Sequence, residues 1–406
     1  MKILQADYTY IDGEYKEGYG VVFGEKIELV APISEVLKHY PNAMPIESDP
    51  HSVLYPGFIN THVHLEFSAN SSTLRYGSFL PWLYSVIEHR DELLNSCDEG
   101  MISRACDEML RSGVTAFGAI SSLGLELDAC IKAPQRVVFF NELIGSNPQT
   151  VDTLYQDFLE RFNSSSMHSK ARITPAIAIH SPYSVHPIVV KKALSLAKKH
   201  NSVVSAHLLE SQAEREWLDS GEGEFGEFFE TLLGQSRPTT SVDEFISAFD
   251  DHPTHFTHCV QANESELKRL SSRGHTIAHC PRSNRLLGCG RLEIERLIAL
   301  KLPFSVATDG LSSNSTLSIF DELRSALMLH HLGDIHKLSK LLMQSVTSIP
   351  AKILGLNVGR IEEGCEADFA LVTLPQKPIQ EDDIALWSIL HTQQVSQVYI
   401  QGERYV

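Results

Sequence analysis

The sequence has 406 residues, 43% hydrophobic and 21% charged, which suits a globular chain with one large domain or one large and one small. Its formal net charge of −17 argues against a surface for nucleic acid or for an anionic membrane, and no apolar run approaches the ~20 residues that span a bilayer. Seven scattered cysteines without a CxxC pair favour reduced thiols in a cytoplasmic protein.

The two ends of the chain share a pattern that differs from the middle. Residues 1–55 carry short strand-like pieces without the core of a signal peptide, and residues 355–406 carry similar pieces, as in "GRIEEGCEADFALVTL". Neither end is long enough to bury a core alone. We therefore expect both termini to pair into one small β-sandwich domain.

Between these ends, residues 56–354 alternate short apolar strands with amphipathic helical stretches. The eight strand-like segments are "GFINTHVH", "VTAFGAIS", "RVVFFNELIG", "ITPAIAIHS", "SVVSAHLLE", "THFTHCV", "TIAHCP" and "FSVATDG". Eight β-then-α units predict a closed (β/α)8 TIM barrel. A Gly- and Glu-rich insertion at 220–241, after the fifth strand, fits either a solvated loop or a lid near the site.

Polar residues able to bind a metal end six of these eight strands. They are His62 and His64, His180, His207 with Glu210, His258, His279, and Asp309. On a strand, side chains two residues apart point to the same face, so the first two imidazoles lie together. Because the active face of a barrel is built at the carboxyl ends of its strands, we expect these side chains to converge.

The convergence predicts one catalytic metal ion. Three neutral imidazoles from His62, His64 and His207 with the carboxylate of Asp309 suit one divalent ion, Zn²⁺ or alternatively Fe²⁺. The fourth strand offers no lysine that could bridge a second ion. Glu210 lies three residues beyond a predicted ligand, where its carboxylate can act as general acid and base without binding the ion.

Taken in order, the motifs "PGFINTHVH", "HSPYSV", "HLLE", "THC", "HCPRSN" and "ATDGLSSN" resemble those of the amidohydrolase superfamily, in its mononuclear nucleoside deaminase branch. Stretches such as "YGSFLPWLYSVI" and "CPRSNRLL" are most similar to 6-aminodeoxyfutalosine deaminases of the futalosine route to menaquinone. The resemblance implies hydrolytic deamination of a 6-aminopurine nucleoside. Glu210, His258 and Asp309 would then be catalytic, and His180, Glu66, His279, Asn284, Arg285 and Glu210 would bind the substrate.

The chain departs from S-adenosylhomocysteine deaminases in the loop after the first strand. Leu80 and Pro81 stand where those enzymes have an acid for the ribose hydroxyls, and Glu66 is the substitute that the sequence offers. The aromatic carboxylate of aminodeoxyfutalosine needs a cation, for which Arg285 is predicted, with Arg75 and Arg282 next.

Three alternatives stay open. An adenosine, methylthioadenosine or S-adenosylhomocysteine deaminase would use the same chemistry, a hydrolase of another heterocycle would use a related one, and an inactive relative would serve as an assembly module. The expected partner is a small nucleoside rather than nucleic acid or membrane, and a homo-oligomer is left open by the sequence.

Overall fold

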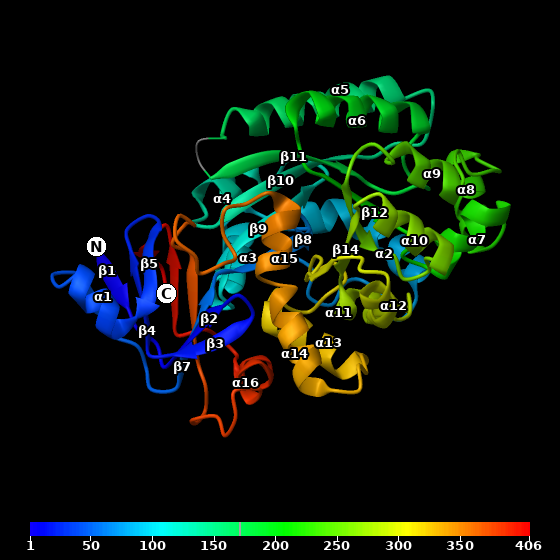
Figure 1. Cartoon of the computed structure of the whole chain (residues 1–406). Coiled ribbons are helices and arrows are strands. Elements are labelled where there is room, and N and C mark those ends of the chain that lie inside the picture. The colour runs from blue at the N-terminus through cyan, green and yellow to red at the C-terminus, as the bar shows by residue number, and fades with distance from the viewer. Residues whose placement is uncertain (170–171) are drawn as a thin grey trace.

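A barrel of eight parallel strands forms the centre of the protein, in a computed structural model that describes residues 1–169 and 172–406 (Figure 1). Each strand pairs with the next in the sequence. The strands are β8 (Phe58–Val63), β9 (Val114–Ser121), β10 (Arg136–Leu143), β11 (Ile173–Ile179), β12 (Val204–Leu208), β13 (Thr254–His258), β14 (Thr276–His279) and β15 (Phe304–Val306). All eight predicted strands, and with them the predicted TIM barrel, are confirmed.

Hydrogen bonds between the ends of β15 and β8 close the barrel. The main-chain N–H of Asp309 donates to the carbonyl oxygen of His62 at 3.1 Å. The buried Asn60 side chain accepts from the main chain of Thr308 at 3.2 Å and donates to its hydroxyl at 2.7 Å. This closure brings the first and last strands, and the predicted ligands that they carry, to one edge of the barrel mouth.

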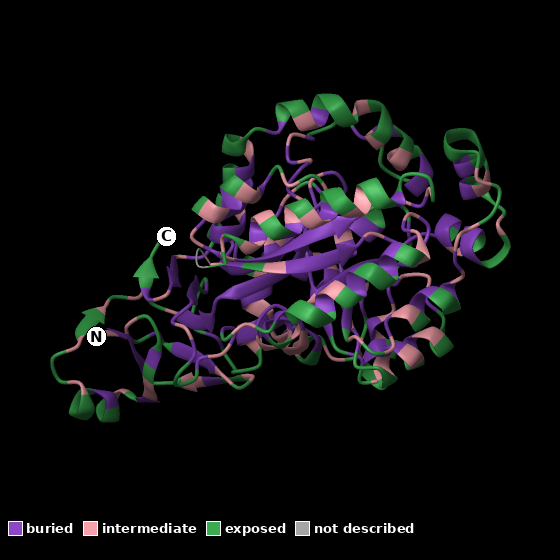
Figure 2. Cartoon of the chain, turned by 90° about the horizontal axis from the view of Figure 1, so that it is seen from above, coloured by how far each residue is buried: buried purple, intermediate pink, exposed green. Residues whose placement is uncertain are grey.

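Helices surround the barrel, with apolar faces toward the strands and polar faces toward solvent (Figure 2). They are α2 (Phe79–Ser96), α3 (Glu99–Arg111), α4 (Leu127–Lys132), α5 (Val151–Ser166), α6 (Pro187–His200), α7 (Gln212–Ser220), α8 (Glu224–Leu233), α9 (Val242–Ala248), α10 (Glu264–Ser272), α11 (Pro281–Leu286), α12 (Ile294–Ala299), α13 (Ile319–Leu329), α14 (Ile335–Gln344) and α15 (Ser348–Leu354). Helix α6 illustrates how the sequence defines such a helix. Pro187 is its first residue, Asn201 caps its end in the left-handed conformation, and its buried positions recur at helical spacing, which forms one apolar face.

Both termini build two small sheets beside the barrel (Figure 1). One sheet has the order β5 (Ile27–Pro32), β4 (Tyr19–Phe23), β1 (Lys2–Leu4) and β6 (Met44–Ile46), and helix α1 (Ile33–His39) connects β5 to β6 in the chain. The other has the order β18 (Glu403–Arg404), β17 (Gln397–Ile400), β16 (Phe369–Thr373), β7 (Ser52–Pro56), β2 (Tyr8–Ile11) and β3 (Glu14–Glu17), with helix α16 (Asp383–His391).

Apolar side chains from both ends of the chain fill the space between these sheets. Phe23 packs edge-on against Phe369 and Tyr399, with ring centroids 5.1 Å and 5.8 Å apart. Strand β7 pairs antiparallel with β16. The expected β-sandwich from both termini is therefore present, while the domain boundaries at residues 55 and 355 stay a prediction.

The Gly- and Glu-rich insertion contributes helix α8 rather than an extended loop. Its aromatic side chains pack on α2: the ring centroids of Phe225 and Phe79 are 6.0 Å apart, and those of Phe228 and Tyr84 are 5.3 Å apart. The insertion is thereby fixed beside the barrel mouth.

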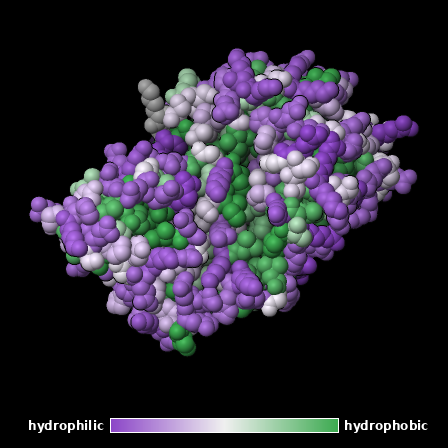
Figure 3. Space-filling model, in the orientation of Figure 1, coloured by the Kyte–Doolittle hydropathy of each residue, from purple (hydrophilic) through white to green (hydrophobic). Residues whose placement is uncertain are grey.

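The surface is mainly polar. Hydrophilic side chains cover most of the face in Figure 3, and hydrophobic ones gather chiefly in a band across its middle. In the part of the chain that the structure describes, none of the helices combines the length and apolarity that crossing a bilayer requires.

Candidate active site

Six barrel strands deliver their predicted polar residues to one end of the barrel. His62, His207, His258 and His279 lie within β8, β12, β13 and β14, and His64, His180, Glu210 and Asp309 follow β8, β11, β12 and β15 directly or within three residues. Most of these side chains are buried. The expected convergence is therefore present in the fold.

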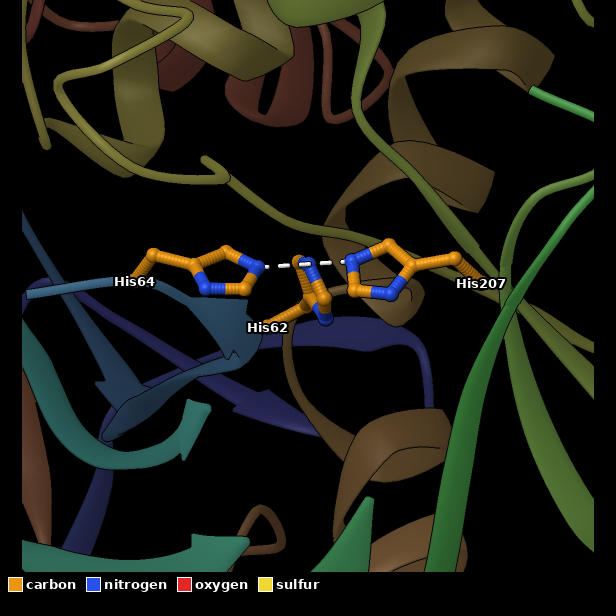
Figure 4. Close-up of side chains that lie close together, drawn as sticks. All are labelled: His62, His64 and His207. Atoms are coloured by element: carbon orange, nitrogen blue, oxygen red, sulfur yellow. Dashed lines mark hydrogen bonds between the residues drawn. The ribbon is translucent and has the colours of Figure 1, made fainter. Parts of the chain in front are cut away.

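Four of these residues direct ligand atoms toward one point. Figure 4 shows ring nitrogens of His64 and His207 pointing toward each other, with the ring of His62 beside them. The Nε2 atoms of His64 and His207 are 3.3 Å apart. Oδ1 of Asp309 is 3.8 Å from Nε2 of His62 and 3.9 Å from Nε2 of His64. These are the four predicted metal ligands.

The protonation states of these groups fit a divalent cation. Burial, reinforced by the neighbouring histidines, holds the pKa of His62 and of His207 well below the usual value, so both rings are neutral. Nδ1 of His207 donates to the carbonyl oxygen of His180 at 2.8 Å, which leaves its Nε2 lone pair toward the cluster. Nε2 of His62 is buried without a hydrogen-bond partner among the described residues. An ion at this point would satisfy it.

Asp309 supplies the negative charge of the cluster. Burial raises the pKa of its carboxyl, but His64 and His258 and a hydrogen bond from Ser283 outweigh that effect and bring the pKa below its ordinary value. Oδ2 accepts from the hydroxyls of Ser283 at 2.7 Å and Ser313 at 2.9 Å. Three imidazole nitrogens with one carboxylate are a donor set that Zn²⁺ accepts.

Backbone strain marks the same strand ends. Leu209, His258 and Asp309 have φ angles of 49°, 71° and 57°, a left-handed conformation that non-glycine residues rarely adopt. Each such residue costs on the order of 1–3 kcal/mol and persists where the surrounding structure enforces it, typically at functional sites. At these strand ends, the left-handed conformation sets the direction in which the side chain points.

Glu210 and His258 form an acid–base pair beside the ligand cluster. Oε1 of Glu210 lies 3.5 Å from Nε2 of His258. Burial, followed by the charges of Asp309 and Glu214, raises the pKa of Glu210 well above its usual value, which favours the protonated carboxyl. Nδ1 of His258 donates to Oδ1 of Asn284 at 2.8 Å, which fixes the ring and leaves Nε2 toward Glu210.

A cavity of about 530 Å³ opens above these groups, a volume typical of small-molecule sites. Its inner end is polar and includes His64, His207, Glu210 and Asp309. Its outer walls are largely apolar, with side chains from α2 and α8 such as Leu83, Val86, Phe228 and Leu233. The predicted insertion thus forms a wall of the site.

Comparison with known proteins agrees with this geometry. The model of the amidohydrolase family matches residues 53–404. The chain belongs to the amidohydrolase family. An aminodeoxyfutalosine deaminase of a Nitratiruptor species is 47% identical to this amidohydrolase over 95% of both chains. An adenosine deaminase of Helicobacter pylori is 36% identical over 97% of this chain and 96% of its own.

Solved structures give the same result. The crystal structure of Helicobacter pylori aminofutalosine deaminase in complex with methylthio-coformycin superposes with a TM-score of 0.95, at 34% identity over 100% of both chains. The likeness therefore includes the small sheets as well as the barrel of this amidohydrolase.

The predicted substrate-binding residues divide into two groups. His180 and Glu66 line the cavity, as does Glu210. His279, Asn284 and Arg285 do not. His279 lies against His330, with their Nε2 atoms 2.9 Å apart, and Asn284 supports His258 from behind.

Arg285 lies outside the cavity because of its position on helix α11. Helix α11 buries Pro281, Ser283 and Asn284, so the next position faces solvent and Arg285 is exposed. The other predicted arginines are also engaged elsewhere: Arg75 lies 3.7 Å from Glu88, and Arg282 lies 3.5 Å from Asp321. The structure therefore does not support the assignment of Arg285 to the substrate carboxylate.

Two cavity residues escaped the sequence analysis. Glu142 is the second-last residue of β10 and lines the cavity, and a carboxylate near the carboxyl end of a barrel strand is a signal that could have identified it. Arg90 of α2 is the only lysine or arginine among the described residues that line the cavity. Nothing in its local sequence separates it from an ordinary surface arginine.

Proposed function

We propose that this amidohydrolase is a metal-dependent deaminase of a 6-aminopurine nucleoside, converting 6-amino-6-deoxyfutalosine and water to futalosine and ammonia. The observation that carries the proposal is the Glu210–His258 pair, 3.5 Å apart, beside four converging metal ligands at the inner end of a nucleoside-sized cavity. The names of the relatives at 47% and 34% identity support the substrate.

The ligand set that we propose is His62, His64, His207 and Asp309, holding about one ion per chain, Zn²⁺ rather than Fe²⁺. When bound, such an ion lowers the pKa of a water from 15.7 to about 7, which provides a nucleophile at neutral pH. The side chains around the ion then transfer the protons of the reaction.

The proton transfers follow from the states of the side chains. Glu210, whose pKa is raised, donates its proton to N1 of the purine, which makes C6 electrophilic. Asp309, whose pKa is lowered, accepts a proton from the water whose oxygen bonds to C6. That proton passes to the amino group, ammonia leaves, and the new C6 hydroxyl returns a proton to Glu210 as the C6 carbonyl forms. His258 holds the oxygen at C6 through Nε2.

The outer cavity supports a substrate with an aromatic, anionic 5′ substituent. Its apolar walls can bury a flat ring, and Arg90 at the exposed end can pair with a carboxylate. Arg90 thus takes the role that the sequence suggested for Arg285. Adenosine remains the second candidate substrate, favoured by the relative at 36% identity.

A direct test measures ammonia release from 6-amino-6-deoxyfutalosine by the metal-loaded protein, with metal content determined on the same sample. Glu210→Gln is the matched control, since it retains all four proposed ligands. We expect Glu210→Gln to release ammonia about 10²–10⁴-fold more slowly than the wild type, with equal metal in both proteins. Ammonia release at the wild-type rate by Glu210→Gln would refute the proposed proton transfers.

A further inference from the structure

A buried carboxylate lies directly behind the proposed general acid. Glu214 is the third residue of α7, is fully buried, and is not among the described residues that line the cavity, so it does not reach a substrate. Its Oε1 accepts from the main-chain N–H of Leu209 at 2.9 Å, and its Oε2 accepts from the main-chain N–H of Glu210 at 2.8 Å. Both oxygens of one carboxylate therefore hold the segment that carries the Glu210 side chain.

Glutamates at the same helix position elsewhere in the barrel cap only their own helix. Glu244 of α9 and Glu266 of α10 each accept from the main-chain N–H of their N-cap residue, at 2.9 Å and 2.8 Å. Such a capping box satisfies an amide that the helix leaves unpaired. Glu214 reaches one and two residues further back, past its N-cap residue Ser211 and into the turn after β12. Its bond to the main chain of Glu210 thus goes beyond what helix capping requires.

The turn that Glu214 holds is strained. Leu209 has its φ angle of 49° in the left-handed region, a conformation that persists only where the surrounding structure enforces it. The main-chain N–H of Gln261 donates to the carbonyl oxygen of Leu209 at 2.9 Å, which fixes the carbonyl side of this residue. Glu214 fixes the N–H side. Burial raises the pKa of Glu214 to about 7, and the main-chain hydrogen bonds favour its ionised form.

The direction of the Glu210 side chain follows from its main chain. Its carboxyl lies 3.5 Å from Nε2 of His258. A misplacement of about 1 Å at a reacting group can cost on the order of 10²-fold in rate. We propose that Glu214 is a positioning residue, which holds the Glu210 carboxyl beside His258 through the two main-chain N–H groups that it binds. This inference rests on the proposed function, in which Glu210 transfers protons at the purine.

The test combines substitutions at the two glutamates. Ammonia release from 6-amino-6-deoxyfutalosine and from adenosine gives kcat and KM for the wild type, Glu214→Gln, Glu210→Gln and the double variant, in mildly alkaline buffer and with metal content determined on each sample. A glutamine at position 214 keeps one acceptor oxygen but turns a donor toward the second main-chain N–H. We expect Glu214→Gln to lower kcat about tenfold on both substrates, with KM and metal content unchanged.

The double variant separates positioning from a purely structural role. If Glu214 acts through Glu210, its substitution has no general acid left to misplace in the Glu210→Gln protein. The double variant should therefore have the kcat of Glu210→Gln. Losses that multiply in the double variant would overturn the inference, because Glu214 would then act independently of Glu210.

Glu244→Gln is the matched control. It removes a capping carboxylate from α9, a helix whose described residues do not line the cavity, so kcat should stay unchanged. If Glu214→Gln does not fold, Glu214→Asp, which keeps the charge but is one methylene shorter, takes its place in the same cycle with the same expected result.

Other outcomes also overturn the inference. Loss of the metal in Glu214→Gln would assign its effect to the ligand His207 rather than to Glu210. A folded Glu214→Gln with the kcat of the wild type would refute the positioning role and leave the proposed function intact. A wild type inactive on both nucleosides would refute the proposed function and this inference with it.

Discussion

Replacing Arg90 by alanine should weaken selection of an anionic substrate while sparing the chemistry. Arg90 lies on α2 at the exposed end of the cavity, away from the proposed ligands and Glu210. Arg285→Ala is the matched control, because this arginine is also exposed but lies outside the cavity. The comparison removes one guanidinium in each protein.

The exposure of Arg90 determines how much kcat/KM the Arg90→Ala substitution should cost. Hydrogen bonds to charged groups contribute about 1.5–3 kcal/mol when buried, and exposed ion pairs about 0.2–1 kcal/mol. A guanidinium at the edge of a half-open cavity lies between these limits, at about 1–2 kcal/mol, which corresponds to roughly fivefold to thirtyfold in kcat/KM. Because the pair is partly exposed, salt should reduce the effect.

The assay compares kcat/KM for 6-amino-6-deoxyfutalosine and for adenosine in each variant at low and high salt. Arg90→Ala should lose activity on the anionic substrate and retain it on adenosine, and Arg285→Ala should resemble the wild type on both. An equal loss on both substrates in Arg90→Ala, or a selective loss in Arg285→Ala, would refute the placement of the carboxylate.

Three further predictions concern the metal and the acid–base pair. His207→Ala should lose both the ion and the activity, and metal analysis finding two ions in fully active wild type would contradict the mononuclear site. Glu210→Gln should keep the ion and lose about 10²–10⁴-fold in kcat, as typical for general acid–base groups, measured by ammonia release. Asn284→Ala should retain the ion but lower kcat about tenfold, since a neutral hydrogen bond of about 1–1.5 kcal/mol fixes His258; an unchanged kcat would show that the ring needs no support.

The barrel and the ligand cluster were accessible from the sequence because both depend on local patterns. Each strand is a short apolar run, and the carboxyl ends of parallel strands meet at one face of the barrel. The convergence of His62, His207 and Asp309 could therefore be predicted from the sequence alone. Glu142 obeyed the same rule near the end of β10.

The outer cavity could not be predicted in the same way. Its walls form where α8 packs on α2, and these two helices are more than a hundred residues apart in the sequence. No local sequence pattern predicts such a contact. For the same reason Arg90 could not be separated from Arg285. A shift of one residue along α11 decides whether a side chain supports His258, as Asn284 does, or faces solvent.

The central claim is tested most directly by the substrate preference of the metal-loaded wild type. Ammonia release is followed with 6-amino-6-deoxyfutalosine, adenosine, 5′-methylthioadenosine and S-adenosylhomocysteine, and kcat/KM is compared. We expect all reactive substrates to give the 6-oxopurine nucleoside and ammonia, with 6-amino-6-deoxyfutalosine the most efficient. A higher kcat/KM for adenosine would reassign the substrate, and the absence of ammonia from all four nucleosides would contradict the deaminase assignment.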